Sequence, residues 1–302
     1  MDHPIFEKFN FVNEFYDDSF HYSISGVKTK KEYEVNIIGN IVAGGRFDMV
    51  SNVAGVPYRL SEDYYEWIDL LTAIEQAEGR FVLLELGAGF GRWISNAALS
   101  IGRHKSKRLK AKFLGVEADH RHFAWMKDHL ALNGIPDHCV HLINGAVAGA
   151  PGFELFPMHD VHATFGTGIT QVGMEGLKDM FDSGIRFAKA GEGLYQIVQV
   201  FSLADCIAAA TGSGELVDII HMDIQGAEAG AIDQSIAVLN QKVKRMHIGT
   251  HSEEIETNIY NTLISNDWRV ERFFRIGSEA FAEFGKFYTS DGLISTVNTR
   301  FS

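Results

Sequence analysis

Three glycines follow a glutamate at the end of an apolar run, in LLELGAGFGRW at residues 83–93. Glycine adopts backbone torsions that other residues avoid, and it lets a ligand approach the main chain closely. The dinucleotide fingerprint needs glycines at its first, third and sixth positions, but arginine stands at the sixth position here. The spacing of Gly87, Gly89 and Gly91 therefore favours a turn that wraps a ligand without a pyrophosphate. The carboxylate of Glu85, just ahead of the turn, could hold a cationic amino-acid group.

Further carboxylates and imidazoles stand at the ends of other apolar runs. Glu117 ends the next run, where a carboxylate can accept hydrogen bonds from both hydroxyls of a ribose. Asp223 ends a later run, where desolvation can raise its basicity; alternatively, it caps the helix after Gly226. His251 ends the following run, and His221 lies two residues before Asp223 on the same face. The three side chains are candidate general bases, although each histidine could instead be a hydrogen-bonded core residue.

Alternating strands and helices must position these residues. Apolar runs typical of buried strands occupy residues 81–86, 113–117, 140–144, 216–222, 246–250, 268–275 and part of 286–298. Helical spacing is found at residues 92–101, 123–133, 229–239 and 253–265. Apolar strands between helices predict an α/β fold with a doubly wound, mostly parallel sheet that is covered on both faces. Such sheets bind ligands at the carboxyl ends of the strands, where the strand order reverses.

The chain divides into an N-terminal extension at 1–60 and a main domain at 61–302. The extension mixes aromatic residues with strand-like runs, such as 33–42, and glycine-rich turns. A helix with a serine cap and an acidic first turn opens the main domain at 61–79. Residues 149–195 interrupt the alternation, and an insert of that length is typical of a lid or binding loop. We expect this insert and the extension to cover an acceptor. Candidate wall residues are Phe165, Tyr195 and His162.

The composition excludes several classes of protein. Apolar residues make up 46% and charged residues 22% of the 302 residues, as in soluble globular proteins. No apolar stretch approaches the roughly 18 residues of a membrane span, and the first residues lack the pattern of a secretory signal. The net charge of −12 argues against nucleic acid as a partner. Cys139 and Cys206 form no CxxC pair and are expected to be small buried side chains in a cytoplasmic protein.

The sequence resembles class I S-adenosylmethionine-dependent methyltransferases, and within them it is most similar to the FkbM family. The resemblance runs from about Phe81 to Phe274. Its elements are LLELGAGFGRW (83–93), GVEAD (115–119), LALNG (130–134), NGAVAG (144–149), VFSLADCI (200–207), VDIIHMDIQGAE (217–228) and RMHIGTHS (245–252). The resemblance implies a Rossmann-like, seven-stranded sheet.

The resemblance also implies an O-methyltransferase that acts on a hydroxyl of a glycan, sugar or secondary metabolite. S-adenosylmethionine would be the methyl donor and S-adenosylhomocysteine the product. The implied cofactor-binding residues are Glu85, Gly87, Ala88, Gly89 and Gly91 at the methionine end, Glu117 and Ala118 at the ribose, Asn144, Gly145 and Ala146 at the adenine, and Asp223 beside the sulfonium. The chain departs from the family at Gln225, where glutamate is usual, and at His221, where lysine is frequent.

No metal site is predicted, although a divalent cation is compatible with the fold. Gln225 removes one acid beside Asp223, and hard cations prefer oxygen ligands. The motifs HCVH (138–141) and HDVH (159–162) do not match a zinc-finger spacing. Rival functions are a dinucleotide-dependent oxidoreductase, a non-catalytic cofactor-binding module and methyl transfer to nitrogen. The aromatic extension could pack on its own domain or on a second subunit of a homo-oligomer.

Overall fold

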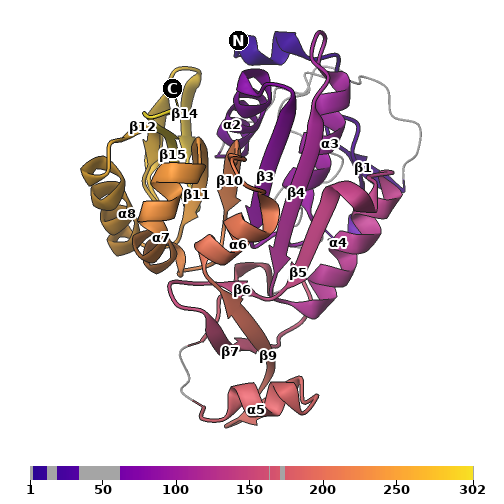
Figure 1. Ribbon diagram of the computed structural model, residues 1–302, viewed down its shortest axis with the longest axis vertical. Helices are drawn as coiled ribbons and strands as arrows, with labels where there is room; N and C mark the ends of the chain where they lie inside the picture. The colour runs from indigo at the N-terminus through magenta and orange to yellow at the C-terminus, as the bar shows by residue number, and fades with distance from the viewer. Residues whose placement is uncertain (1–2, 12–18, 34–61, 163, 171–173, 302) are drawn as a thin grey trace.

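The computed structural model describes residues 3–11, 19–33, 62–162, 164–170 and 174–301. Its centre is a seven-stranded sheet of order β12-β15-β11-β10-β3-β4-β5 (Figure 1). The strands are β3 (Arg80–Leu86), β4 (Lys110–Glu117), β5 (Val140–Asn144), β10 (Ile219–Met222), β11 (Arg245–Thr250), β12 (Trp268–Phe274) and β15 (Gly292–Asn298). Strand β15 runs antiparallel to β11 and β12, and the other pairs are parallel. The predicted fold class is therefore confirmed.

Helices cover both faces of this sheet because β3, at its centre, carries apolar side chains on both sides. In β3, Phe81 and Leu83 belong to one core cluster, whereas Val82, Leu84 and Leu86 belong to the other, as the alternation of side chains along a strand requires. The first cluster is completed by α2 (Glu62–Gln76), α3 (Arg92–Arg103) and α4 (His120–Leu132). The second is completed by α6 (Leu203–Ala210), α7 (Glu228–Lys242) and α8 (Glu253–Ser265).

The insert forms a sheet of its own, where the sequence favoured a lid or loop. Its strands are β6 (Ala146–Val147), β7 (Gly152–Pro157), β8 (Phe187–Ala190) and β9 (Gly193–Phe201), joined by η4 (Thr164–Gly166) and α5 (Leu177–Asp182). Figure 1 shows this sheet below the main one, beyond the ends at which β3 and β4 finish. Leu155 and Ile197 are buried and give it an apolar cluster of its own. The strand order of the main sheet reverses between β3 and β10, next to this second sheet.

Short elements pack around the main domain. They are η1 (Pro4–Lys8), β1 (Phe20–Tyr22), β2 (Lys28–Lys30), η2 (Lys31–Tyr33), η3 (Asp137–Cys139), β13 (Glu279–Ala282) and β14 (Gly285–Tyr288). Ile5, Phe6 and Phe9 of the extension enter the core beside α2. The run predicted at 33–42, beyond Tyr33, and the glycines that follow it lie outside the described residues. Among the described helices, none has the length and apolar character needed to cross a membrane.

Candidate functional site

The glycine turn between β3 and α3 lies directly against the end of β10. Gly87, Gly89 and Gly91 have φ values of 76°, 53° and 76°, in the left-handed region that favours glycine. A Cβ atom on Gly87 would lie 1.8 Å from the backbone oxygen of Asp223, and one on Gly89 would lie 3.2 Å from Cε1 of Phe165. Glycine at position 87 is therefore required by contact with the protein itself, in addition to any contact with a ligand.

A cavity opens at this turn, between the carboxyl ends of the main strands and the second sheet. Seven of the predicted cofactor residues line it, namely Gly87, Gly89, Glu117, Ala118, Gly145, Ala146 and Asp223. The cavity lies at the reversal of strand order between β3 and β10, which is where open α/β sheets bind ligands. These seven residues, which the sequence analysis assigned to a cofactor, thus lie around one cavity.

The remaining predicted cofactor residues lie outside the cavity lining. Glu85 is buried, and its two carboxylate oxygens accept hydrogen bonds of 2.9 Å each from the backbone N–H groups of Trp93 and Ile94. Burial raises the pKa of this carboxyl to about 7, although those hydrogen bonds and a nearby histidine oppose the shift. Glu85 thus fixes the start of α3.

Asn144, also outside the lining, donates hydrogen bonds to the backbone oxygens of Glu117 and Ala118. The other two residues outside the lining are Ala88 and Gly91.

Glu117 links the glycine turn to the start of α4. Its Oε2 accepts a hydrogen bond of 2.8 Å from the N–H of Gly89, and its Oε1 accepts one of 2.8 Å from the N–H of Asp119. Burial is the main cause that raises the pKa of this carboxyl to about 8, against the effect of the backbone hydrogen bonds. Each oxygen retains lone-pair capacity. Glu117 can therefore accept hydroxyl hydrogen bonds from a ligand in the cavity.

One end of the cavity is apolar and aromatic. Phe165 of the insert was a candidate wall residue, and it lines the cavity stacked on His122 of α4, with ring centroids 4.0 Å apart. His122 is held by a hydrogen bond of 2.7 Å to the backbone oxygen of Val161, and burial lowers its pKa. Its sequence position gave no signal of this role. Other lining residues that the sequence analysis missed include Val147, Phe156, Thr167 and Ile169. Tyr195 and His162 lie outside the lining.

Asp223, Glu228 and His251 form a charged cluster at the other end of the cavity. His251 Nδ1 lies 3.0 Å from Glu228 Oε1, and its Nε2 lies 3.2 Å from Asp223 Oδ1. Glu228 is fully buried, whereas the Asp223 side chain is 44% exposed. Gln225, at a strained φ of 54°, donates a hydrogen bond of 2.7 Å to Asp223 Oδ1. The resemblance described in the sequence analysis had led us to expect an acid at this position.

The cluster keeps His251 protonated at neutral pH. Burial alone would lower the pKa of His251, but the hydrogen bonds and negative charges of Asp223 and Glu228 raise it to about 10. A protonated imidazole cannot accept a proton, so His251 cannot be the base while both carboxylates are ionised. Of the candidate bases in this cluster, Asp223 is the one with an exposed carboxylate in the cavity lining.

The His251 cluster predicts a pH dependence of stability. The folded pKa of about 10 is above the ordinary value of 6.5, so the stabilising contribution is complete below pH 6.5 and is lost as the pH rises through about 10. The free energy of unfolding of the wild type should therefore fall across this interval. In His251→Gln it should fall less, as measured by urea denaturation at a series of pH values. If the free energy of unfolding fell equally with pH in the two proteins, the raised pKa of His251 would be contradicted.

His221 belongs to a different cluster from Asp223. Its Nε2 lies 3.0 Å from Glu66 Oε2 of α2, and its ring is parallel to that of His247 on β11. The sequence suggested that His221 and Asp223 share a face. The structure brings His221 under α2, where its partners are Glu66, His247 and the ring of Trp93.

Comparison with known proteins agrees with this geometry. No protein-family model matches the chain. A protein of Jannaschia sp. (strain CCS1) named "Putative methyltransferase" is 31% identical over 216 residues, which are 72% of this chain and 72% of that protein. The chain belongs to this methyltransferase family.

Solved structures resemble this methyltransferase more distantly. Methyltransferase FkbM from Methylobacillus flagellatus KT has a TM-score of 0.45 and 10% identity, and the match covers 78% of this chain and 50% of that one. An O-methyltransferase from Bacillus cereus in complex with SAH has a TM-score of 0.40 and 12% identity, and the match covers 88% and 89% of the two chains. The strand order given above establishes the fold.

Proposed function

We propose that this methyltransferase moves a methyl group from S-adenosylmethionine to a hydroxyl of a small-molecule or glycan acceptor, with S-adenosylhomocysteine as the product. The FkbM-type sequence elements suggest this reaction. The observation that carries the proposal is that Glu117 lines one cavity together with the glycine turn, to which it is hydrogen-bonded through Gly89, and with aromatic side chains. An adenosyl ligand requires these three environments in one site.

The lining fits the three parts of S-adenosylmethionine. Phe156, Ile169 and the stacked pair of Phe165 and His122 offer an apolar wall for an adenine ring. The Glu117 carboxylate offers acceptors to the ribose hydroxyls. At the glycine turn the backbone is open to the amino-acid end of the ligand.

The chain's own residues would serve an in-line displacement. S-adenosylmethionine supplies a methyl group on a sulfonium. The acceptor oxygen forms a bond to the methyl carbon as the carbon–sulfur bond breaks, and the hydroxyl proton goes to the Asp223 carboxylate. Glu228 holds His251 against Asp223, and this fixes the orientation of the base.

Replacing Glu117 by glutamine should weaken S-adenosylmethionine binding. Hydrogen bonds to charged groups contribute about 1.5–3 kcal/mol, so above pH 8, where the Glu117 carboxyl is ionised, the dissociation constant should rise by about 10- to 100-fold. Calorimetric titration of Glu117→Gln measures the effect. The control variant Glu154→Gln changes the same residue type on β7, outside the cavity lining. An unchanged dissociation constant in Glu117→Gln would mean that the ribose lies elsewhere.

A methyl-transfer assay tests the reaction itself. The purified chain is incubated with methyl-labelled S-adenosylmethionine and a panel of sugars, glycans, hydroxylated metabolites and amines. The proposal expects S-adenosylhomocysteine and a methyl ether to form together. A labelled amine as the product would mean methyl transfer to nitrogen. Cofactor binding without turnover on the whole panel would favour a non-catalytic binding module.

A further inference from the structure

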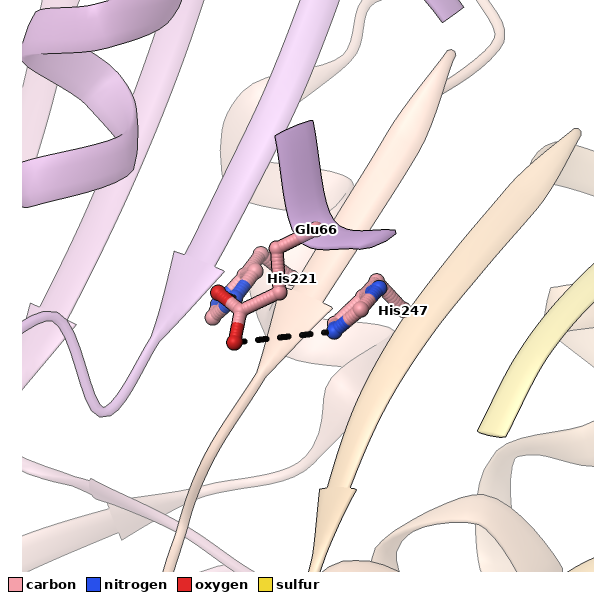
Figure 2. Close-up of side chains that lie close together, drawn as sticks. All are labelled: Glu66, His221 and His247. Carbon is pink, nitrogen blue, oxygen red and sulfur yellow. Dashed lines mark hydrogen bonds and ion pairs between the residues drawn. The ribbon is translucent and has the colours of Figure 1, made fainter. Parts of the chain in front are cut away.

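Two histidines and a glutamate converge beneath α2, outside the cavity described above. Figure 2 shows Glu66 reaching down from α2 to His221 on β10 and His247 on β11. Glu66 Oε2 lies 3.0 Å from His221 Nε2, and Glu66 Oε1 lies 3.9 Å from His247 Nε2. One nitrogen or oxygen atom from each residue lies within 4.8 Å of the others. The separations of 3.0 and 3.9 Å fit neighbouring ligands of one metal ion, since two atoms that each lie about 2.0–2.2 Å from zinc are at most about 4.4 Å apart.

The fold fixes the three side chains relative to one another. His221 and His247 are directly paired across the parallel strands β10 and β11, and their rings are inclined by only 5° with centroids 5.2 Å apart. Glu66 comes from a helix that packs on the same face of the sheet. Because the strand register and the helix packing both constrain the site, its geometry does not depend on a loop.

Asp69, one turn further along α2, orients His247. Its Oδ2 lies 2.7 Å from His247 Nδ1, so Nδ1 donates a hydrogen bond to Asp69 and the ring is held with Nε2 towards Glu66. Asp69 is itself held by Arg272 at 2.9 Å and by Arg245 at 3.4 Å. Metal-binding histidines almost always donate their second ring N–H to a carboxylate or carbonyl in this way.

The cluster has unsatisfied bonding capacity. His221 Nδ1 is buried and has no hydrogen-bond partner among the described residues. Among the described residues, the Glu66 carboxylate forms ion pairs with the two imidazoles, and Arg92 also attracts it electrostatically. Such a buried set is costly unless each polar group is paired. A divalent cation would bind the Glu66 carboxylate and the Nε2 atoms of both imidazoles at once, whereas His221 Nδ1 is on the other edge of its ring and is not one of these ligand atoms.

We propose that Glu66, His221 and His247 bind a divalent transition-metal ion. Two imidazole nitrogens and one carboxylate oxygen suit Zn²⁺, Fe²⁺, Co²⁺ or Mn²⁺, whereas Mg²⁺ and Ca²⁺ prefer oxygen ligands. Three protein ligands leave at least one coordination position for water or another small ligand. This inference is independent of the proposed methyl transfer.

The site lies near the cluster of Asp223, Glu228 and His251. Asp291, in the loop before β15, interacts electrostatically with Glu66 of this site and with Asp223, Glu228 and His251 of the other cluster. His221 and Glu66 keep 13% and 16% of their side chains exposed. A free coordination position on that side would therefore be accessible from solvent.

The cluster of Asp223, Glu228 and His251 is the alternative location for an ion. It suits one less well because its carboxylates are already occupied. Glu228 accepts hydrogen bonds from the N–H groups of Ile224 and Gly226, and the amide of Gln225 donates to Asp223. Variants of both clusters are needed to distinguish the two sites.

The test is metal binding by the full chain after treatment with a chelator. Zn²⁺ and Co²⁺ are titrated calorimetrically, and Co²⁺ is also followed by its visible absorption. The proposal expects one ion per chain. Loss of an outer partner of a metal ligand typically lowers the affinity for the metal by about 10- to 100-fold. We therefore expect a decrease of this size in Asp69→Asn. The affinity for the metal should fall by more than about 100-fold in each of the ligand variants Glu66→Gln, His221→Gln and His247→Gln.

Two control variants should bind the metals as the wild type does. Asp223→Asn alters the alternative cluster, and His104→Gln breaks another buried histidine–glutamate pair, with Glu75. Circular dichroism checks that each variant is folded. If a histidine variant does not fold, Glu66→Gln still tests the site, because glutamine has nearly the same shape as glutamate. Absence of binding in the millimolar range would overturn the proposal. Binding that survives Glu66→Gln but is lost in Asp223→Asn would overturn it as well, because the ion would then belong to the other cluster.

Discussion

Replacement of Asp223 by asparagine is expected to lower kcat by about 10²- to 10⁴-fold, which is the usual contribution of a general base. The Asp223 carboxylate lines the cavity and is 44% exposed, so an acceptor hydroxyl can reach it. Asparagine has the same shape but cannot take up the proton. His251 does not replace it in the wild type, because a pKa of about 10 keeps that imidazole protonated.

Steady-state kinetics and calorimetry of Asp223→Asn together test this role. The dissociation constant for S-adenosylmethionine should stay close to that of the wild type, and the circular dichroism spectrum should not change. Asp128→Asn is the matched control, since Asp128 is exposed on α4 and outside the cavity lining. Wild-type kcat in Asp223→Asn would remove this carboxylate from the proton transfer.

Replacement of Gly87 by alanine should abolish cofactor binding and destabilise the fold. The new Cβ would lie 1.8 Å from the backbone oxygen of Asp223, so the glycine turn and the end of β10 would have to separate. The left-handed torsion alone costs about 1–3 kcal/mol for a residue with a side chain, and the clash adds to that cost. Urea denaturation measures the stability, and calorimetric titration measures the affinity for S-adenosylmethionine.

Gly134→Ala separates the torsional cost from the clash. Gly134 has a φ of 66°, and a Cβ atom there would meet nothing within 4 Å. This variant should lose only the torsional part of the stability and should bind S-adenosylmethionine normally. Equal losses of stability in the two variants would show that Asp223 and the turn are not in close contact.

The fold could be read from the sequence because its signals are local. The run 81–86 carries apolar side chains on both faces, and β5 has the predicted bounds. Gly87, Glu117 and Asp223 were assigned to one cavity because each follows or ends such a run, and the carboxyl ends of parallel strands meet at one edge. The bounds of β10 were too long by three residues at its start, since the strand begins at Ile219.

Features that depend on long-range packing could not be read from the sequence. An acid before a glycine turn can contact a ligand or cap the following helix, and Glu85 caps α3. His122 meets Phe165 only because the insert folds onto α4. The partnership of Glu66 with His221 joins residues 155 positions apart, and it requires both the register of β10 and the packing of α2. The spacing of residues in the sequence does not indicate such a contact.

Calorimetric titration of the purified chain with S-adenosylmethionine, S-adenosylhomocysteine and NADH tests the central claim most directly. The cavity of Glu117, Phe165 and the glycine turn predicts that both adenosyl ligands bind at one site per chain and that NADH does not. Binding of NADH alone would indicate a dinucleotide-dependent oxidoreductase, and binding of none of the three would contradict the assignment of this cavity to the methyl donor.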